Sequence, residues 1–214
     1  DDVPTIIYDE IDTGMTGMSH NMHRFVKDHI LPPLWQNADR PVLVNNWEGT
    51  YFNFNERKLL SMARTAQKLG VELFVLDDGW FGQRNNDKAG LGDYDVNHKK
   101  LPGGIDGLCD AINRLGMDFG LWFEPEMVCP DSKLHRAHPD WAVQTPGLEP
   151  APGRHQLVLD LFRAAVRTYI VDSVNKTLDS ANIRYGKVGM NRPPAAHFPP
   201  ALTHPGTFSP PSPL

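Results

Sequence analysis

The chain has 214 residues, of which 40% are hydrophobic and 22% are charged, a composition that fits a globular protein with one sizeable core. Its formal net charge of −5, without a basic stripe, argues against nucleic-acid binding. No apolar run reaches the ~18 residues that a membrane-spanning helix needs. The two cysteines do not predict a disulfide framework, and no signal-like apolar stretch follows Asp1, so both a cytoplasmic and a secreted localisation stay open.

Residues 1–40 have a mixed composition and predict one short helix, near residues 19–29, with Ser19 as its N-cap. The stretch LPPLWQNADRP that follows predicts a connector, because its prolines cannot continue a helix. We therefore place a domain boundary at about residue 40 and expect the next domain to span residues 41–192.

The second segment opens on the β-branched run PVLVNNW, which predicts a first strand. Apolar residues at helical spacing predict a helix after it, over about residues 53–69. Asn53 and Glu56 have the spacing of a capping box, and Gly70 is a favourable helix stop.

A cryptic repeat follows. The stretches KLGVELFVLDDGW and RLGMDFGLWFEPE share a basic residue, a Leu-Gly pair and an apolar strand that ends in carboxylates and aromatic residues. A helix over about residues 163–180 then leads into a fourth strand, ANIRYGKVGMN. Strands that alternate with helices predict a parallel sheet of the α/β class.

Four such units amount to about half of a TIM-type (β/α)8 barrel, which typically needs ~250 residues. A doubly wound open sheet is the alternative, but no G-x-G-x-x-G motif follows the first strand. In either fold, ligands gather at the carboxyl ends of the strands.

Residues 193–214 differ sharply from what precedes them, with eight prolines and no Asp, Glu, Lys or Arg. Such a stretch cannot form a helix or an interior strand, so we expect a disordered tail. Because the change is abrupt, we also expect that the proper continuation of the barrel was lost at this point.

The predicted strands all end in polar and aromatic residues. Carboxylates accept hydrogen bonds from hydroxyl groups, lysine and asparagine donate them, and an indole packs on the apolar face of a pyranose ring. Each feature alone has an ordinary structural explanation, since DDG is usually a turn and single tryptophans are usually core residues. Their clustering at matching strand ends favours a sugar site formed by Asn45, Asn46, Trp47, Glu48, Asp77, Asp78, Trp80, Trp122, Glu124, Glu126, Lys187 and Asn191.

The stretches RPVLVNNWEGTYFNF, FVLDDGWFG, FGLWFEPEM, AHPDW, GRHQLVLD and YGKVGMNR occur in this order and resemble the catalytic barrel of the family 36 glycoside hydrolases, the α-galactosidases. GMSHNMHRFVKDHI resembles the segment that leads from the N-terminal β-sandwich domain of that family into its barrel, so residues 1–40 become a lead-in segment. The resemblance implies retaining hydrolysis of terminal α-galactose, as in melibiose and raffinose, without a metal or cofactor. His20 and His23 lack a third ligand nearby, which also argues against a metal site.

The resemblance implies a role for individual residues. Trp47 and Trp122 match walls of the galactose pocket, and Asp77 and Asp78 match the acids that hold the O4 and O6 hydroxyls. The remaining residues that match sugar-binding positions are Arg154, Lys187 and Asn191.

Gly189 is where the chain departs from the family. The fourth strand of the family ends Lys-Trp-Asp-Met-Asn, with the Asp as nucleophile, whereas here the five residues are KVGMN. A retaining glycosidase needs two carboxyl groups ~5 Å apart. Because Gly189 has no side chain and the acid/base belongs to a later strand of the family, we expect a fragment that is inactive.

Three other hypotheses stay open: a non-catalytic galactose-binding relative, a non-functional truncated product, and a transferase like the raffinose-synthesising relatives, which would need the same missing nucleophile. Half a barrel would also leave strand edges unpaired, which predicts self-association through those edges.

Overall fold

The computed structural model describes residues 14–144 and 153–191. The chain divides into two compact units, Asp1–Pro41 and Val42–Leu214, and each is described by itself. The predicted tail, residues 193–214, lies outside the described residues. Among the described helices, none is both long and apolar enough to cross a membrane.

The first unit contains α1 (Gly14–Phe25), the π-helical turn η1 (Val26–Ile30) and α2 (Pro33–Gln36). The predicted helix start is wrong, because Ser19 lies inside α1 rather than at its N-cap. The predicted connector also contains α2. Its Pro33 stands at the first helical position, where the missing N–H has no intrahelical partner to lose.

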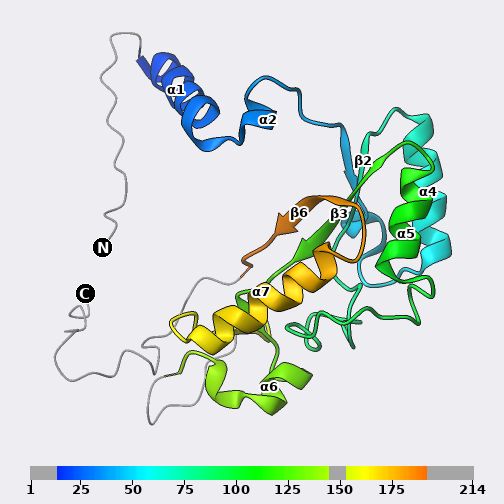
Figure 1. The fold of residues 1–214 in the computed structure, drawn as a ribbon, viewed down its shortest axis with the longest axis vertical. Coiled ribbons are helices and arrows are strands. Elements are labelled where there is room, and N and C mark those ends of the chain that lie inside the picture. The colour runs from blue at the N-terminus through cyan, green and yellow to red at the C-terminus, as the bar shows by residue number, and fades with distance from the viewer. Residues whose placement is uncertain (1–13, 145–152, 192–214) are drawn as a thin grey trace. The chain divides into compact units, whose positions relative to one another are not determined.

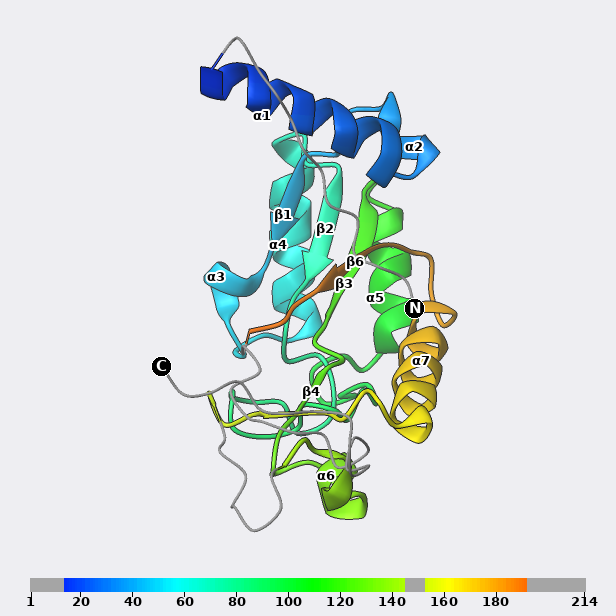
Figure 2. The same ribbon diagram turned by 90° about the vertical axis from the view of Figure 1, so that its left-hand side faces the viewer.

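The second unit is built on a parallel sheet, which confirms the predicted α/β class (Figures 1 and 2). The strand order is β1-β2-β3-β6, so neighbours in the sheet follow the order of the chain. Leu43 pairs with Leu73, Leu73 with Asp118, and Trp122 with Lys187. The strands are β1 (Leu43–Asn45), β2 (Leu73–Leu76), β3 (Asp118–Phe123) and β6 (Ile183–Val188).

Helices α4 (Glu56–Lys68) and α5 (Gly104–Asn113) lie side by side against the sheet (Figures 1 and 2). Both confirm the predicted alternation, as does α7 (Ala164–Leu178). Their apolar faces bury residues against β2 and β3, and this burial is the main stabilising term of the unit. The core includes Leu59, Ala63, Phe74, Leu76, Ile105, Leu108, Ile112, Phe119 and Leu121.

The start of α4 differs from the prediction. Asn55, not Asn53, is the N-cap, and its side chain accepts a hydrogen bond from the Lys58 N–H at 3.0 Å. Glu56 does not reach back to close a capping box, because its carboxylate accepts the Gly103 N–H at 3.2 Å instead. The predicted stop is confirmed: α4 ends at Lys68, and Gly70 has a φ of 79°.

A smaller antiparallel sheet, β4 (Met127–Val128) with β5 (Leu157–Val158), follows β3 and was not predicted. It packs in a second apolar cluster with α6 (Lys133–Ala137) and the 3-10 turn η2 (Pro139–Trp141). Two residues per strand are too short to give an alternating pattern, which is why the sequence carried no signal for it. A short helix, α3 (Trp47–Thr50), follows β1.

Candidate functional site

Asp77, at the carboxyl end of β2, joins three strands of the sheet. Its Oδ2 accepts hydrogen bonds from Asn45 Nδ2 at 2.5 Å and from Lys187 Nζ at 2.7 Å. Asn45 ends β1 and Lys187 lies near the end of β6. The backbone N–H of Asp77 donates to Asn46 Oδ1 at 2.7 Å. Hydrogen bonds therefore hold both the backbone and the side chain of Asp77 in place.

Asp78 forms a buried ion pair with Arg84. The guanidinium group donates to both carboxylate oxygens: Nε lies 2.9 Å from Oδ1, and Nη2 lies 2.8 Å from Oδ2. Burial raises the pKa of Asp78 above its usual value, although the hydrogen bonds and charge of Arg84 act in the opposite direction. Lys100 supports the loop between them, since its Nζ donates to the carbonyl oxygens of Gly79 and Arg84.

The two aspartates each keep accepting capacity on one oxygen. Oδ2 of Asp77 has two donors, whereas its Oδ1 has one, the Asp78 N–H at 2.9 Å. Oδ2 of Asp78 has two contacts from Arg84, whereas its Oδ1 has one. Because a carboxylate oxygen can accept about two hydrogen bonds, each Oδ1 can take one further donor, such as a hydroxyl group.

Glu124 follows β3 and is fully buried. Its Oε1 accepts the Asn191 N–H at 2.6 Å, and its Oε2 accepts from Gln156 Nε2 at 3.3 Å. Its own N–H donates to the Tyr94 hydroxyl at 3.2 Å. Gln156 and Tyr94 were missed by the sequence reasoning, because a lone glutamine or tyrosine in a loop carries no spacing signal.

Gly189 lies against Trp122 at the end of β3. A Cβ atom at this position would lie 3.0 Å from Trp122 Nε1 and 3.4 Å from Asn191 Nδ2. The position that the family resemblance assigns to the nucleophile is therefore next to two of the predicted sugar-binding residues. Trp122 itself is buried, and its ring stacks on Phe81 with centroids 6.3 Å apart.

Trp47 reaches this cluster through Asn45. The backbone N–H of Trp47 donates to Asn45 Oδ1 at 2.7 Å, while Nδ2 of the same amide contacts Asp77. The Trp47 ring is partly exposed and packs edge-on against Tyr51 and Phe52. Trp80, by contrast, offers no exposed ring surface on which a sugar could pack. Its ring is fully buried, and its Nε1 donates to the Trp122 carbonyl oxygen. That part of the prediction is wrong, because Trp80 faces the core.

Among the described residues, the Arg154 side chain contacts none of this cluster, although Gln156 of the same turn donates to Glu124. Arg154 lies with His155 at the centre of a tight turn whose ends, Gly153 and Gln156, exchange two backbone hydrogen bonds. Arg154 and His155 have φ angles of 50° and 61°, a left-handed conformation that costs roughly 1–2 kcal/mol per residue without glycine. The Arg154 side chain is exposed and has no hydrogen-bond or ion-pair partner among the residues that the structure describes.

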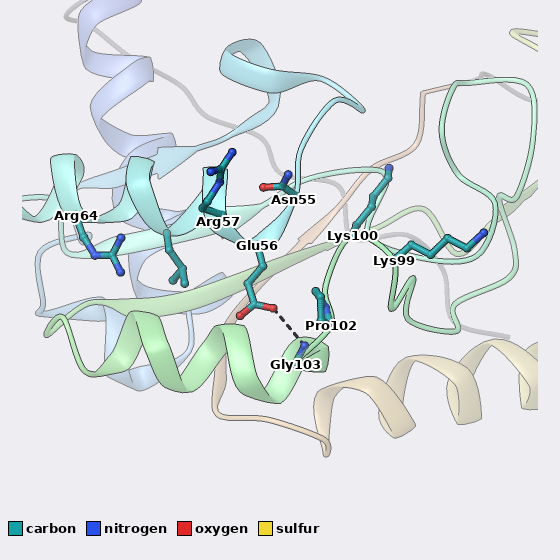
Figure 3. Close-up of a pocket in the computed structure, with 9 residues that line it drawn as sticks. Asn55, Glu56, Arg57, Arg64, Lys99, Lys100, Pro102 and Gly103 are labelled. Carbon is teal, nitrogen blue, oxygen red and sulfur yellow. Dashed lines mark hydrogen bonds between the residues drawn. The ribbon is translucent and has the colours of Figure 1, made fainter.

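A cavity of about 540 Å³ lies elsewhere, between the N-terminal ends of α4 and α5 (Figure 3). None of its lining residues belongs to the predicted site. Figure 3 shows Arg57, Arg64 and Lys99 pointing in different directions, so these cations do not converge on one ligand. Within residues 14–144 and 153–191, no three His, Cys, Asp or Glu side chains gather as metal ligands.

The class of protein defined by these features is an α/β protein with a polar cluster at the carboxyl ends of parallel strands, the place where β/α-barrel enzymes bind substrate. The Melibiase family model matches residues 2–202. The chain is 49% identical to α-galactosidase AgaA of Geobacillus stearothermophilus over 189 residues, 88% of this chain and 26% of AgaA. It is 43% identical to α-galactosidase 1 of Pediococcus pentosaceus, with the same coverage of each chain. The chain belongs to glycoside hydrolase family 36.

The crystal structure of AgaA superposes with a TM-score of 0.82 and covers 84% of this chain and 25% of that one. Variants of AgaA have been crystallised in complex with raffinose and with stachyose. The galactosidase domain of an α-galactosidase–sucrose kinase, AgaSK, superposes with a TM-score of 0.81 at 42% identity. The chain thus spans about a quarter of the length of the relatives it matches.

Proposed function

We propose that the ends of β1, β2, β3 and β6 form the galactose-binding part of an α-galactosidase site. The ion pair between Lys187 and Asp77 supports this most directly. It joins two predicted site residues that are 110 positions apart in the chain. With Asp78, Trp47, Trp122, Arg154 and Asn191, they would hold a terminal α-galactosyl group like those of melibiose and raffinose.

In this proposal the chain binds the sugar but does not cleave it. The family activity is retaining hydrolysis, in which one carboxylate attacks the anomeric carbon and a second group protonates the leaving oxygen. Gly189 has no group that can attack. Loss of a nucleophile lowers turnover by about 10⁴-fold or more in covalent enzymes.

Calorimetric titration with galactose and glucose tests sugar binding, because the two sugars differ only at the C4 hydroxyl that the aspartates would hold. We expect heat from galactose, little from glucose, and no nitrophenol release from an aryl α-galactoside. Equal binding of both sugars, or of neither, would contradict the proposal. The Asp77→Asn variant should lose binding, whereas the exposed-site variant Asp95→Asn should keep it.

The Gly189→Asp variant tests the catalytic half of the proposal. We expect it to remain inactive, because the resemblance assigns the acid/base to a later strand of the family. Nitrophenol release by this variant would show that this chain supplies the second carboxyl group, and that Gly189 alone blocks turnover. A chain that keeps galactose binding while staying inactive fits a non-catalytic galactose-binding relative.

We also propose that the chain self-associates through its edge strands. In the described sheet, β1 and β6 each have a neighbour on one side only, and apolar residues on or next to them are exposed, including Leu43 at 41% and Val188 at 66%. Unpaired strand edges with apolar side chains favour pairing with another chain. Light scattering across a concentration series should show oligomers that dissociate when Val188 is replaced by Lys; a monomer at all concentrations would contradict this.

A further inference from the structure

Glu124 is a buried carboxylate with an unusual set of partners. It has no exposed surface, and among the described residues no lysine or arginine forms an ion pair with it. Burying a carboxylate without a counter-charge is costly unless its oxygens accept hydrogen bonds. Here each oxygen accepts one, from a different part of the chain.

The first of these parts is the segment that leaves β6. Two acceptors just after one another at the end of β3 hold it: the backbone carbonyl oxygen of Phe123 accepts the Gly189 N–H at 2.8 Å, and the side-chain Oε1 of Glu124 accepts the Asn191 N–H at 2.6 Å. Phe123 and Glu124 therefore extend the contact of β3 with the segment after β6 from Val188, the last strand residue, to Asn191. The two residues held are Gly189, which is the nucleophile position, and Asn191, a predicted sugar-binding residue.

The second part is the left-handed turn that carries Arg154. Gln156 closes this turn, and its Nε2 donates to Glu124 Oε2 at 3.3 Å. The turn is held in a conformation that side-chain-bearing residues rarely adopt, so it needs an anchor outside itself. Glu124 and Gln156 provide that anchor, 32 positions apart in the chain.

We propose that Glu124 is a positioning residue that holds the segment at residues 189–191 and the Arg154 turn in register with the end of β3. This inference deepens the proposed function, on which its relevance to galactose rests. In this proposal Glu124, which was predicted as a member of the sugar site, does not contact the sugar, because it is fully buried and both of its oxygens accept hydrogen bonds from the protein. It acts through the backbone of Asn191 and the side chain of Gln156, which both present donors to it.

The partners of Glu124 predict different effects for three substitutions. In Glu124→Gln, the new amide can still accept from the Asn191 N–H. Its NH₂ group can donate to Gln156 if that amide turns over, because Gln156 Oε1 has no partner among the described residues. Glu124→Asp keeps the charge but withdraws the carboxylate by one methylene, so it should lose Asn191. Glu124→Ala removes both acceptors.

The control is Glu126→Ala. Glu126 lies two residues further along the same segment, and its Oε2 has no hydrogen-bond partner in the described part of the chain. It is therefore the same residue type in the same region without the contacts to Asn191 and Gln156.

The test is amide hydrogen exchange at Asn191, measured by NMR, with Gly189 as internal reference. We expect exchange at Asn191 to rise at least about tenfold in Glu124→Asp and Glu124→Ala, as for loss of one hydrogen bond to a charged group. It should change little in Glu124→Gln and Glu126→Ala, and Gly189 should stay protected in all four. Unchanged exchange in Glu124→Asp, or equal loss in the Gln and Asp variants, would overturn the proposal. If the Glu124→Ala variant does not fold, the comparison of Glu124→Asp with Glu124→Gln still tests the proposal.

Galactose titration of the same variants separates this inference from the proposed function. If both hold, Glu124→Asp weakens galactose binding and the exposed-site control Asp95→Asn does not. If the exchange pattern is found but the unmodified chain binds no galactose, Glu124 positions the segment and the proposed function is wrong.

Discussion

Arg84 and Asp78 form a bidentate ion pair in which the side chains are only 2% and 8% exposed. Asp78 is a predicted sugar-site residue, whereas no sequence pattern pointed to Arg84. The structure makes them a unit: Arg84 occupies most of the carboxylate and leaves one accepting position on Oδ1. A ligand can therefore donate a hydrogen bond to Asp78 only at Oδ1.

Removing Arg84 should destabilise the fold strongly. Arg84→Met leaves the Asp78 carboxylate buried without its partner, and breaking a buried pair in this way costs about 3–5 kcal/mol. Urea unfolding measures the loss. The double variant Asp78→Asn with Arg84→Met should recover part of it, because no buried charge remains. Arg136→Met, which breaks an exposed pair with Asp131, should cost at most about 1 kcal/mol. A similar cost for both single variants would count against this account.

Replacing either of two glycines in the same chain segment by alanine should change the stability of the fold differently: one substitution should destabilise it, and the other should not. Gly189→Ala places a methyl group 3.0 Å from Trp122 Nε1 and should cost about 1 kcal/mol or more through overpacking. Gly186→Ala meets nothing within 4 Å and should be neutral or stabilise by up to about 1 kcal/mol, because it restricts the unfolded chain. Thermal unfolding of both variants provides the comparison, and a Gly189→Ala variant as stable as Gly186→Ala would show that Trp122 moves freely.

Lys187→Met should weaken galactose binding without unfolding the chain. Lys187 is 44% exposed at its side chain, so its pair with Asp77 adds little to stability, but the methionine removes a donor from the cluster. A lost hydrogen bond to a charged group corresponds to roughly 10- to 100-fold in affinity. Calorimetry against Lys176→Met, an exposed lysine of α7, supplies the control. Equal affinities in the two variants would remove Lys187 from the site.

The chain should show a pH-dependent stability that originates at Lys100. Burial lowers the pKa of Lys100 from 10.5 to about 8. Between these values the unfolded chain binds more protons than the folded chain, so the contribution of Lys100 to the free energy of unfolding rises with pH. Below pH 8 the penalty for the buried ammonium is fully present. The unfolding free energy of the unmodified chain minus that of Lys100→Met should therefore increase from pH 8 to pH 10. A flat difference would mean that Lys100 titrates as an ordinary lysine.

The sheet and the strand-end cluster were predictable because both follow from short-range patterns. Apolar runs that end in Asn45, Asp77 and Trp122 mark parallel strands, and parallel strands bring their carboxyl ends to one edge. The partners that hold those residues were not predictable. Arg84 contacts Asp78 six positions earlier in the chain, and Gln156 contacts Glu124 32 positions earlier. Neither spacing matches the repeat of a helix or a strand, so no periodic pattern in the sequence indicates these contacts.

The order of strands also has a consequence for biosynthesis. Each strand of the sheet docks beside the one made immediately before it in that sheet, from β1 through β2 and β3 to β6. A ribosome therefore delivers every new strand to an edge that has already emerged, and no strand must wait for a distant partner. We expect nascent chains stalled after α5 to protect β2 from proteolysis before β6 has been translated.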